Sequence, residues 1–156
     1  MATTKNAAKT AKSTTSASYD GFTEAERSAM KDRAKELKAR GAKGPKVDPE
    51  IEVLEKLAEM DPSDRAIGEK IHAIIKANAP MLTPKTWYGM PAYARDGKIV
   101  CHFQPAAKFK TRYAMLGFSD QANLDDGDFW PAYYAITQLT PADEKKIAAI
   151  VERAAA

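Results

Sequence analysis

The chain has few of the residues that carry chemistry in most small enzymes. It contains one cysteine and two histidines in 156 residues, so no internal disulfide can form and no Cys-x-x-Cys or His-x-x-x-His pair can hold zinc. No apolar run approaches the roughly 20 residues that a membrane-spanning helix needs, and no secretory signal pattern is present. These absences predict a cytoplasmic protein that makes no membrane contact.

Catalytic motifs are also absent. The chain has no Gly-x-Gly-x-x-Gly, P-loop or Gly-x-Ser-x-Gly sequence, each of which would place backbone amides or a nucleophile at a reacting group. Cys101 and His102 are neighbours on a predicted strand, so their side chains should point to opposite faces and cannot easily act on one atom. We expect Cys101 to be a small buried hydrophobic residue and the protein to be non-enzymatic.

Basic charge is concentrated at the front of the chain. Residues 1–46 hold 11 Lys and Arg against 5 Asp and Glu, whereas residues 47–156 hold 13 against 16. Residues 1–20 are rich in Ser, Thr and Ala, too polar to offset the entropy of ordering, and should form a disordered basic tail. We assign residues 21–46 to a helix and a flexible hinge, and residues 47–156 to one domain.

Three helix starts are indicated before the predicted strands and one after them. Thr23 and Glu26 form a capping-box pattern, Asp48 and Asp61 each precede a proline as helix N-caps, and Thr140 starts a last helix. On the helix after Asp48 the apolar residues Ile51, Leu54 and Leu57 recur at helical spacing, which predicts that they face the core.

Between residues 85 and 138 the apolar period changes from about 3.6 to 2. Lys98–Gln104 alternates strictly, residues 111–118 and 132–138 behave similarly, and Asp96-Gly97 is a two-residue hairpin signal. The sequence therefore predicts an α+β fold, in which an antiparallel sheet of four to five strands packs against N-terminal helices and one C-terminal helix.

An antiparallel sheet can leave one face open to a ligand. The aromatic residues of this sheet cannot all be buried without partners for their polar ends, so some should line a surface, although half-buried sheet positions would also explain them. The candidate ligand-binding residues are Trp87, Tyr88, Gly89, Met90, Pro91, Tyr93, His102, Arg112 and Tyr113.

The chain resembles the bacterial YdhG-like domains of unknown function in one stretch of sequence. This stretch begins with WYGMPAY at residues 87–93 and continues with a Gly97 turn, an apolar strand, Lys108 and the Tyr113–Phe118 strand. The resemblance covers about residues 50–154 and is most specific at the Gly-Met-Pro corner. It implies a frataxin-like α+β domain, and some members of this group are described as intracellular iron chaperones. Its implied partners are ferrous iron and the proteins that assemble iron–sulfur clusters or haem. The resemblance transfers no ligand set.

The sequence offers carboxylates of suitable chemistry for weakly held ferrous iron. Glu52, Glu55 and Glu59 fall at i, i+3 and i+7 of one predicted helix, and exposed carboxylate oxygens suit a metal that must be released. The same pattern also describes the solvent face of an ordinary amphipathic helix.

Three functions follow, in order of preference. The first is an iron-binding or iron-chaperone-like protein. The second is a non-enzymatic module that binds a small molecule or peptide on the aromatic sheet face. The third, ranked below both, is nucleic-acid contact through the basic N-terminal arm.

Overall fold

The computed structural model describes residues 21–41, 44 and 47–156. Its elements run α1 (Glu24–Gly41), α2 (Pro49–Glu59), α3 (Pro62–Asn78), β1 (Thr83–Trp87), β2 (Met90–Arg95), β3 (Lys98–Gln104), α4 (Ala106–Phe109), β4 (Ala114–Phe118), β5 (Tyr133–Ile136) and α5 (Pro141–Ala155). The predicted disordered tail, residues 1–20, and much of the predicted hinge lie outside the described residues.

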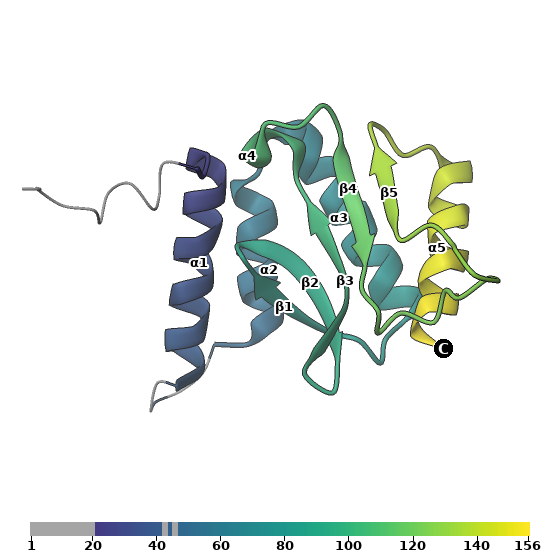
Figure 1. The fold of residues 1–156 in the computed structure, drawn as a ribbon, viewed down its shortest axis with the longest axis horizontal. Coiled ribbons are helices and arrows are strands. Elements are labelled where there is room, and N and C mark those ends of the chain that lie inside the picture. The colour runs from purple at the N-terminus through teal and green to yellow at the C-terminus, as the bar shows by residue number, and fades with distance from the viewer. Residues whose placement is uncertain (1–20, 42–43, 45–46) are drawn as a thin grey trace, which may run out of the picture.

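The five strands form one antiparallel sheet in the order β1-β2-β3-β4-β5, so each strand pairs with its neighbour in the sequence. In Figure 1, α2 and α3 lie behind this sheet, α5 lies at the β5 end, and α1 stands outermost beside α2. The α+β fold expected from the sequence is confirmed, with five strands.

Short-range sequence signals account for most boundaries. The Asp48 side chain accepts a hydrogen bond from the Glu50 amide at 2.9 Å, and Thr140 forms a full capping box with Asp143. Each side chain thus satisfies one amide of its helix start that has no partner within the helix. The Asp96-Gly97 turn has positive φ angles of 51° and 78°, as a type I′ hairpin requires.

The hydrophobic core lies between the sheet and the helices α3 and α5. Its largest side chains, each almost fully excluded from solvent, include Tyr93, Phe103, Ile71, Ile75, Leu116, Leu124 and Val151. This packing covers one face of the sheet and leaves the opposite face without a described helix in front of it (Figure 1).

One helix face differs from the sequence prediction. On α2 the buried residues are Val53 and Leu57, whereas Ile51 and Leu54 are 49% and 47% exposed. The apolar residues of α2 extend around more of the helix than a single packed stripe. The face of α2 that is buried carries Val53 and not Leu54. The prediction that Ile51 and Leu54 face the core was therefore wrong.

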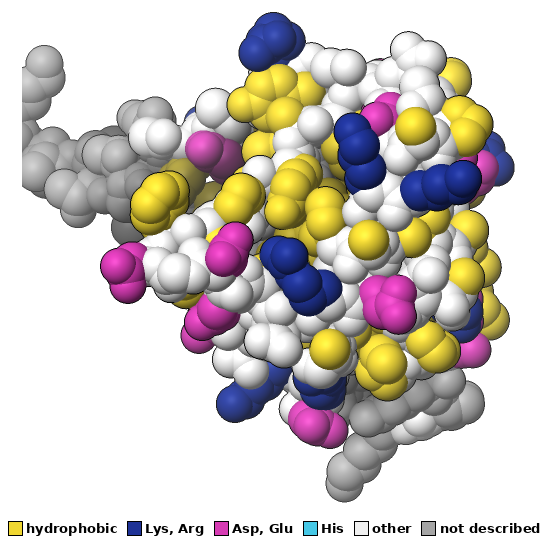
Figure 2. Space-filling view, turned by 90° about the vertical axis from the view of Figure 1, so that its right-hand side faces the viewer, with side chains coloured by type: hydrophobic (Ala, Val, Ile, Leu, Met, Phe, Trp, Pro, Cys, Tyr) yellow, Lys and Arg dark blue, Asp and Glu magenta, His cyan; other side chains and the backbone are white. Residues whose placement is uncertain are grey.

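Charged side chains of both signs are interspersed with hydrophobic ones on the side of the molecule that Figure 2 shows. Such a mixed surface is ordinary for a protein exterior.

Candidate functional site

The open face of the sheet carries a line of residues placed by strand register. Lys85 pairs with Ala92, Ala92 with His102, His102 with Gly117, and Gly117 with Tyr133. Residues directly opposite each other on paired strands point to the same face. Their neighbours Tyr93, Cys101 and Phe118 belong to the buried core, so alternation places this line on the other face.

Four rings follow this line, and we call Tyr88, Trp87, His102 and Tyr133 the aromatic row. The centroids of Trp87 and Tyr88 are 5.0 Å apart at an interplanar angle of 89°. His102 lies 5.1 Å from Trp87 and 6.0 Å from Tyr133. Each separation is within the range of favourable ring contacts, so the row is continuous from the β1–β2 turn to β5.

Small residues on the intervening strands make room for these rings. Ala92 lies between Lys85 and His102 in the register, with Trp87 one position away along the same face of β1. On β4, a Cβ atom added to Gly117 would lie 2.6 Å from ring atoms of both His102 and Tyr133, closer than real Cβ contacts allow. The His102 and Tyr133 rings therefore close over the backbone of Gly117.

The row is unequally exposed. His102 is only 7% exposed, and burial lowers the pKa of its imidazole, so the ring is neutral at pH 7. Tyr133 is 59% exposed, and Trp87 and Tyr88 are half-buried. The surface offered to a ligand is thus an exposed phenol and a half-buried indole beside an uncharged imidazole.

Two arginines flank aromatic rings near this face. The guanidinium carbon of Arg33, from α1, lies 5.6 Å from the centroid of the Tyr88 ring. Arg112 lies 5.1 Å from the Tyr113 centroid. Both distances fit cation–π contacts. Arg112 and Tyr113, which the sequence nominated, form a pair of their own before β4.

Several other nominated residues are not surface groups. Tyr93 is fully buried, Pro91 is nearly so, and Met90 is 6% exposed. Tyr93 pairs with Cys101 in register and points with it into the core. The assignment of Tyr93 and Pro91 to a ligand-binding surface was therefore wrong, whereas Met90 pairs with Trp87 and lies on the face where Trp87, Tyr88 and His102 are brought together. Gly89 is buried in the β1–β2 turn.

The lone cysteine is a core residue, as expected. Cys101 is 1% exposed, and burial raises the pKa of its thiol to about 12. A thiol in this state is a poor nucleophile and a poor metal ligand. His102 points to the opposite face, so the adjacent pair is split by strand alternation as the sequence predicted.

The glutamates of α2 that the sequence nominated for iron lie in two different environments. Glu59 Oε2 lies 3.5 Å from Lys56 Nζ, whereas Glu52 and Glu55 line a groove beside α1. Within the described part of the chain, no group of three or more His, Cys, Asp or Glu side chains is arranged to hold a metal ion. Iron binding at these glutamates stays a prediction.

Sequence reasoning missed two participants. Tyr133 was left out of the predicted surface, although the alternation of residues 132–138 places it opposite the core-facing Tyr134 and Ile136. Glu36 of α1 accepts hydrogen bonds from the amides of Tyr88 and Gly89. More than 50 residues separate Glu36 from these two amides in the sequence, so no local sequence pattern could predict the contact.

Comparison with known proteins gives no match to a family model, a curated protein or a solved structure. The resemblance to YdhG-like domains therefore stays a prediction. None of the described helices is long and apolar enough to cross a membrane.

Proposed function

We propose that this protein is a non-enzymatic binding module whose aromatic row takes an uncharged, planar ligand by stacking. The observation that supports this proposal is the continuous aromatic row, which lies on a sheet face that no described helix covers (Figure 1). Aromatic side chains provide large contact areas at small conformational cost. Tyr133, more than half exposed, is the residue available to the ligand.

The electrostatics of the row favour a ligand without charge. His102 is held neutral by burial, and its neighbours Trp87 and Tyr133 are uncharged rings. A charged ligand stacked on these three rings would lose hydration, and none of the three rings carries an opposite charge to offset that loss. An apolar ring would bury its surface against Tyr133 and Trp87 and gain roughly 25 cal/mol per Å² of apolar area removed from water.

An uncharged fluorescent probe, N-phenyl-1-naphthylamine, tests this proposal. We expect saturable binding to the full chain, weakened at least about tenfold by Tyr133→Ala, since the most exposed ring of the row is lost. Phe129→Ala is the matched control, because Phe129 is 89% exposed and lies outside the row. Absence of saturable binding, or equal affinities for the two variants, would reject the proposal.

Ferrous-iron handling is the second candidate, and the position of Glu52 and Glu55 along one groove favours it. Anaerobic calorimetric titration of ferrous iron, with the Glu52→Gln/Glu55→Gln/Glu59→Gln variant beside the wild type, tests it. Loss of binding in the variant would support the acidic helix as the site, whereas equal heats in both proteins would exclude these glutamates as the iron site.

A further inference from the structure

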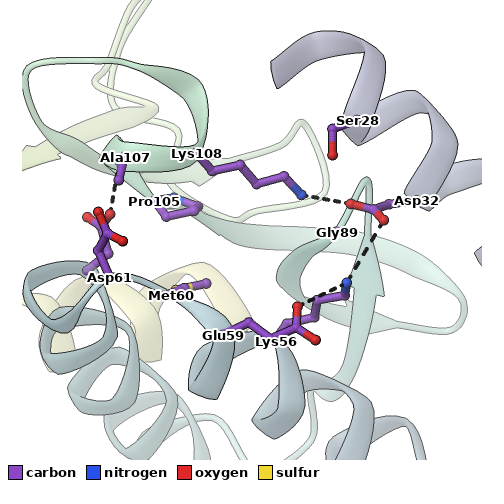
Figure 3. A pocket seen from close by; sticks show the side chains of 11 residues that line it. Ser28, Asp32, Lys56, Glu59, Met60, Asp61, Gly89, Pro105, Ala107 and Lys108 are labelled. Atoms are coloured by element: carbon purple, nitrogen blue, oxygen red, sulfur yellow. Dashed lines mark hydrogen bonds and ion pairs between the residues drawn. The ribbon is translucent and has the colours of Figure 1, made fainter. Parts of the chain in front are cut away.

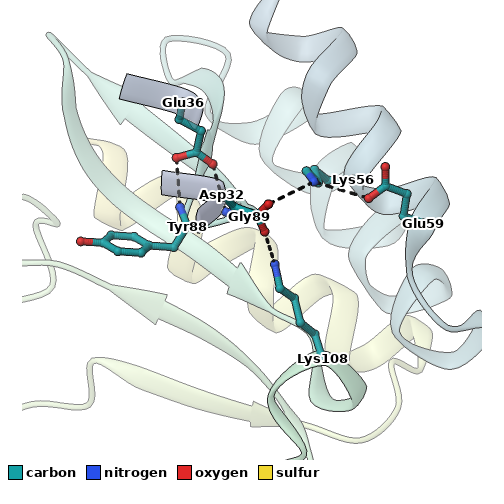
Figure 4. A network of polar contacts seen from close by, with 7 residues as sticks. All are labelled: Asp32, Glu36, Lys56, Glu59, Tyr88, Gly89 and Lys108. Atoms are coloured by element: carbon teal, nitrogen blue, oxygen red, sulfur yellow. Dashed lines mark hydrogen bonds and ion pairs between the residues drawn. The ribbon is translucent and has the colours of Figure 1, made fainter. Parts of the chain in front are cut away.

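The β1–β2 turn presents two backbone amides that its own hairpin does not use. Trp87 pairs with Met90, and the turn residues Tyr88 and Gly89 have positive φ angles of 52° and 74°. N–H groups at the two centre positions of such a turn lie outside the ladder and need an acceptor elsewhere. Here Glu36 supplies both acceptors, with its carboxylate oxygens 3.1 Å from Tyr88 N and 3.0 Å from Gly89 N (Figure 4).

Two lysines converge beside the same turn. Lys108 Nζ donates to Asp32 Oδ2 at 2.8 Å, and Lys56 Nζ lies 3.9 Å from Asp32 Oδ1. A Cβ atom on Gly89 would collide with both the Asp32 carboxylate and the Lys108 ammonium, so this ion pair sits directly against the turn. The two amides therefore bind the Glu36 carboxylate, which also lies 3.4 Å from Arg33 Nη1. The two ammonium groups contact the Asp32 carboxylate beside it (Figure 4).

Few apolar contacts hold α1 in this position. Its buried residues are Ala25 and Ala29, whereas Leu37 is 51% exposed and Phe22, just before the helix, is 43% exposed. Small side chains bury little surface, so hydrophobic burial contributes little to docking. The helix is held mainly through its carboxylates, and such contacts are open to competition from another anion.

We propose that the Tyr88 and Gly89 amides, with Lys56 and Lys108, form an oxyanion-binding site that accepts a phosphate group, and that α1 fills it with its own Asp32 and Glu36 carboxylates. A phosphate dianion offers acceptor oxygens to both amides and a charge to both lysines. This site shares Tyr88 with the aromatic row but uses its backbone amide and not its ring, so either proposal can fail without the other.

Space for the ligand adjoins these donors. A cleft of about 520 Å³ is lined by Asp32, Lys56, Gly89 and Lys108, with Ser28 and Met60 among its other walls (Figure 3). A phosphate group could enter this cleft as the Asp32 side chain leaves. The volume also admits an organic part attached to the phosphate.

Three further carboxylates line the cleft and limit where an anion can bind. Glu59 is paired with Lys56, and Asp64 accepts hydrogen bonds from the amides of Ala106 and Ala107. Asp61 lies at the Ala107 end of the cleft, away from Gly89 (Figure 3). The anion therefore binds at the Gly89 end, where the donors converge.

The test is a titration of the full chain with inorganic phosphate at pH 7.5, followed through the ¹⁵N-amide resonances of Tyr88 and Gly89. We expect Asp32→Ala/Glu36→Ala to bind phosphate at least about tenfold more tightly than the wild type, since the competing carboxylates are gone. Lys108→Gln added to this variant should reverse the gain. Glu24→Ala/Glu152→Ala, two exposed positions, is the control with the same change in net charge, and it should bind like the wild type.

Equal binding in the wild type and the Asp32→Ala/Glu36→Ala variant would overturn the proposal, as would a gain that survives Lys108→Gln or appears in the control. If the variant does not fold, pyrophosphate is titrated into the wild type. Shifts of the Tyr88 and Gly89 amides that Lys108→Gln abolishes then support the site, and their absence rejects it. Tighter binding of O-phosphoserine than of inorganic phosphate would assign the site to a phosphorylated ligand, and equal affinity to the free anion.

Discussion

The Nδ1 atom of His72 lies 2.9 Å from the phenolic oxygen of Tyr93, between α3 and the sheet. The Nε2 atom of the same ring lies 3.1 Å from Glu50 Oε1, and Glu50 Oε2 in turn accepts from Lys76 at 3.0 Å. The buried phenol is thereby linked through one imidazole to an ion pair at the surface. Burial raises the pKa of Tyr93 well above its ordinary value, so its hydroxyl stays protonated and the hydrogen bond persists across the physiological pH range.

Tyr93→Phe is expected to lower the free energy of unfolding by about 1 to 2 kcal/mol. The change leaves His72 Nδ1 without its partner at a position that is 8% exposed, and a buried unpaired polar atom carries a cost of this order. Urea unfolding followed by circular dichroism measures the effect. Tyr133→Phe, which removes a hydroxyl from a mostly exposed ring, should change stability by less than about 0.5 kcal/mol. Similar losses in both variants would contradict the role given to His72.

Asp64 joins the start of α3 to the short helix α4. Its carboxylate is buried and accepts the amides of Ala106 at 3.0 Å and Ala107 at 2.9 Å. Asp64→Ala leaves both amides without an acceptor and should cost about 2 to 4 kcal/mol in chemical denaturation. Asp61→Ala is the comparison, since the Asp61 side chain makes no cap hydrogen bond, and should cost much less. If Asp64→Ala left the stability unchanged, another group would have to satisfy these amides.

His102 should make stability depend on pH near neutrality. Burial lowers its folded-state pKa below the ordinary value of 6.5, so the unfolded chain takes up a proton first as the pH falls. Stability is therefore full above about pH 6.5 and is lost as the pH drops from there toward the folded-state pKa. Denaturation of wild type and His102→Gln at pH 7.5 and 5.5 checks this, because His72 is common to both. The wild type should lose more stability, and equal losses would exclude His102 as the cause.

The thiol of Cys101 should react only when the protein opens. It is 1% exposed, and burial raises its pKa to about 12, so both access and thiolate are missing in the folded state. We expect labelling by 5,5′-dithiobis(2-nitrobenzoic acid) at pH 8 to be at least about 1,000-fold slower than in urea, following the equilibrium between folded and open states. Rapid labelling without denaturant would show that β3 is accessible in the native ensemble.

The fold could be predicted from the sequence because its signals are local. Proline-linked N-caps, the Asp96-Gly97 turn and the alternation of Lys98–Gln104 each act within a few residues. Strand β1 (Thr83–Trp87) was not predicted, and its Pro84 lacks the amide that a central strand needs. As β1 is an edge strand, a proline is tolerated there.

The candidate site was less predictable because it depends on which sheet face the helices cover. Alternation separates Cys101 from His102 but does not say which set is buried. A β-bulge between Tyr93 and Ala94 further shifts the alternation along β2. Tyr93 was therefore assigned to the wrong face, while Trp87 and His102 were grouped correctly.

The order of strands in the sheet has a kinetic consequence. Because each strand pairs with the one before it, no crossover has to close before pairing can begin, and the longest connection inside the sheet is residues 119–132. Contacts between near neighbours in the chain form quickly, since little loop entropy is lost. The sheet can thus assemble by adding one hairpin at a time, with β5 joining last across the longest loop. The core is enclosed only after β5 has paired with β4.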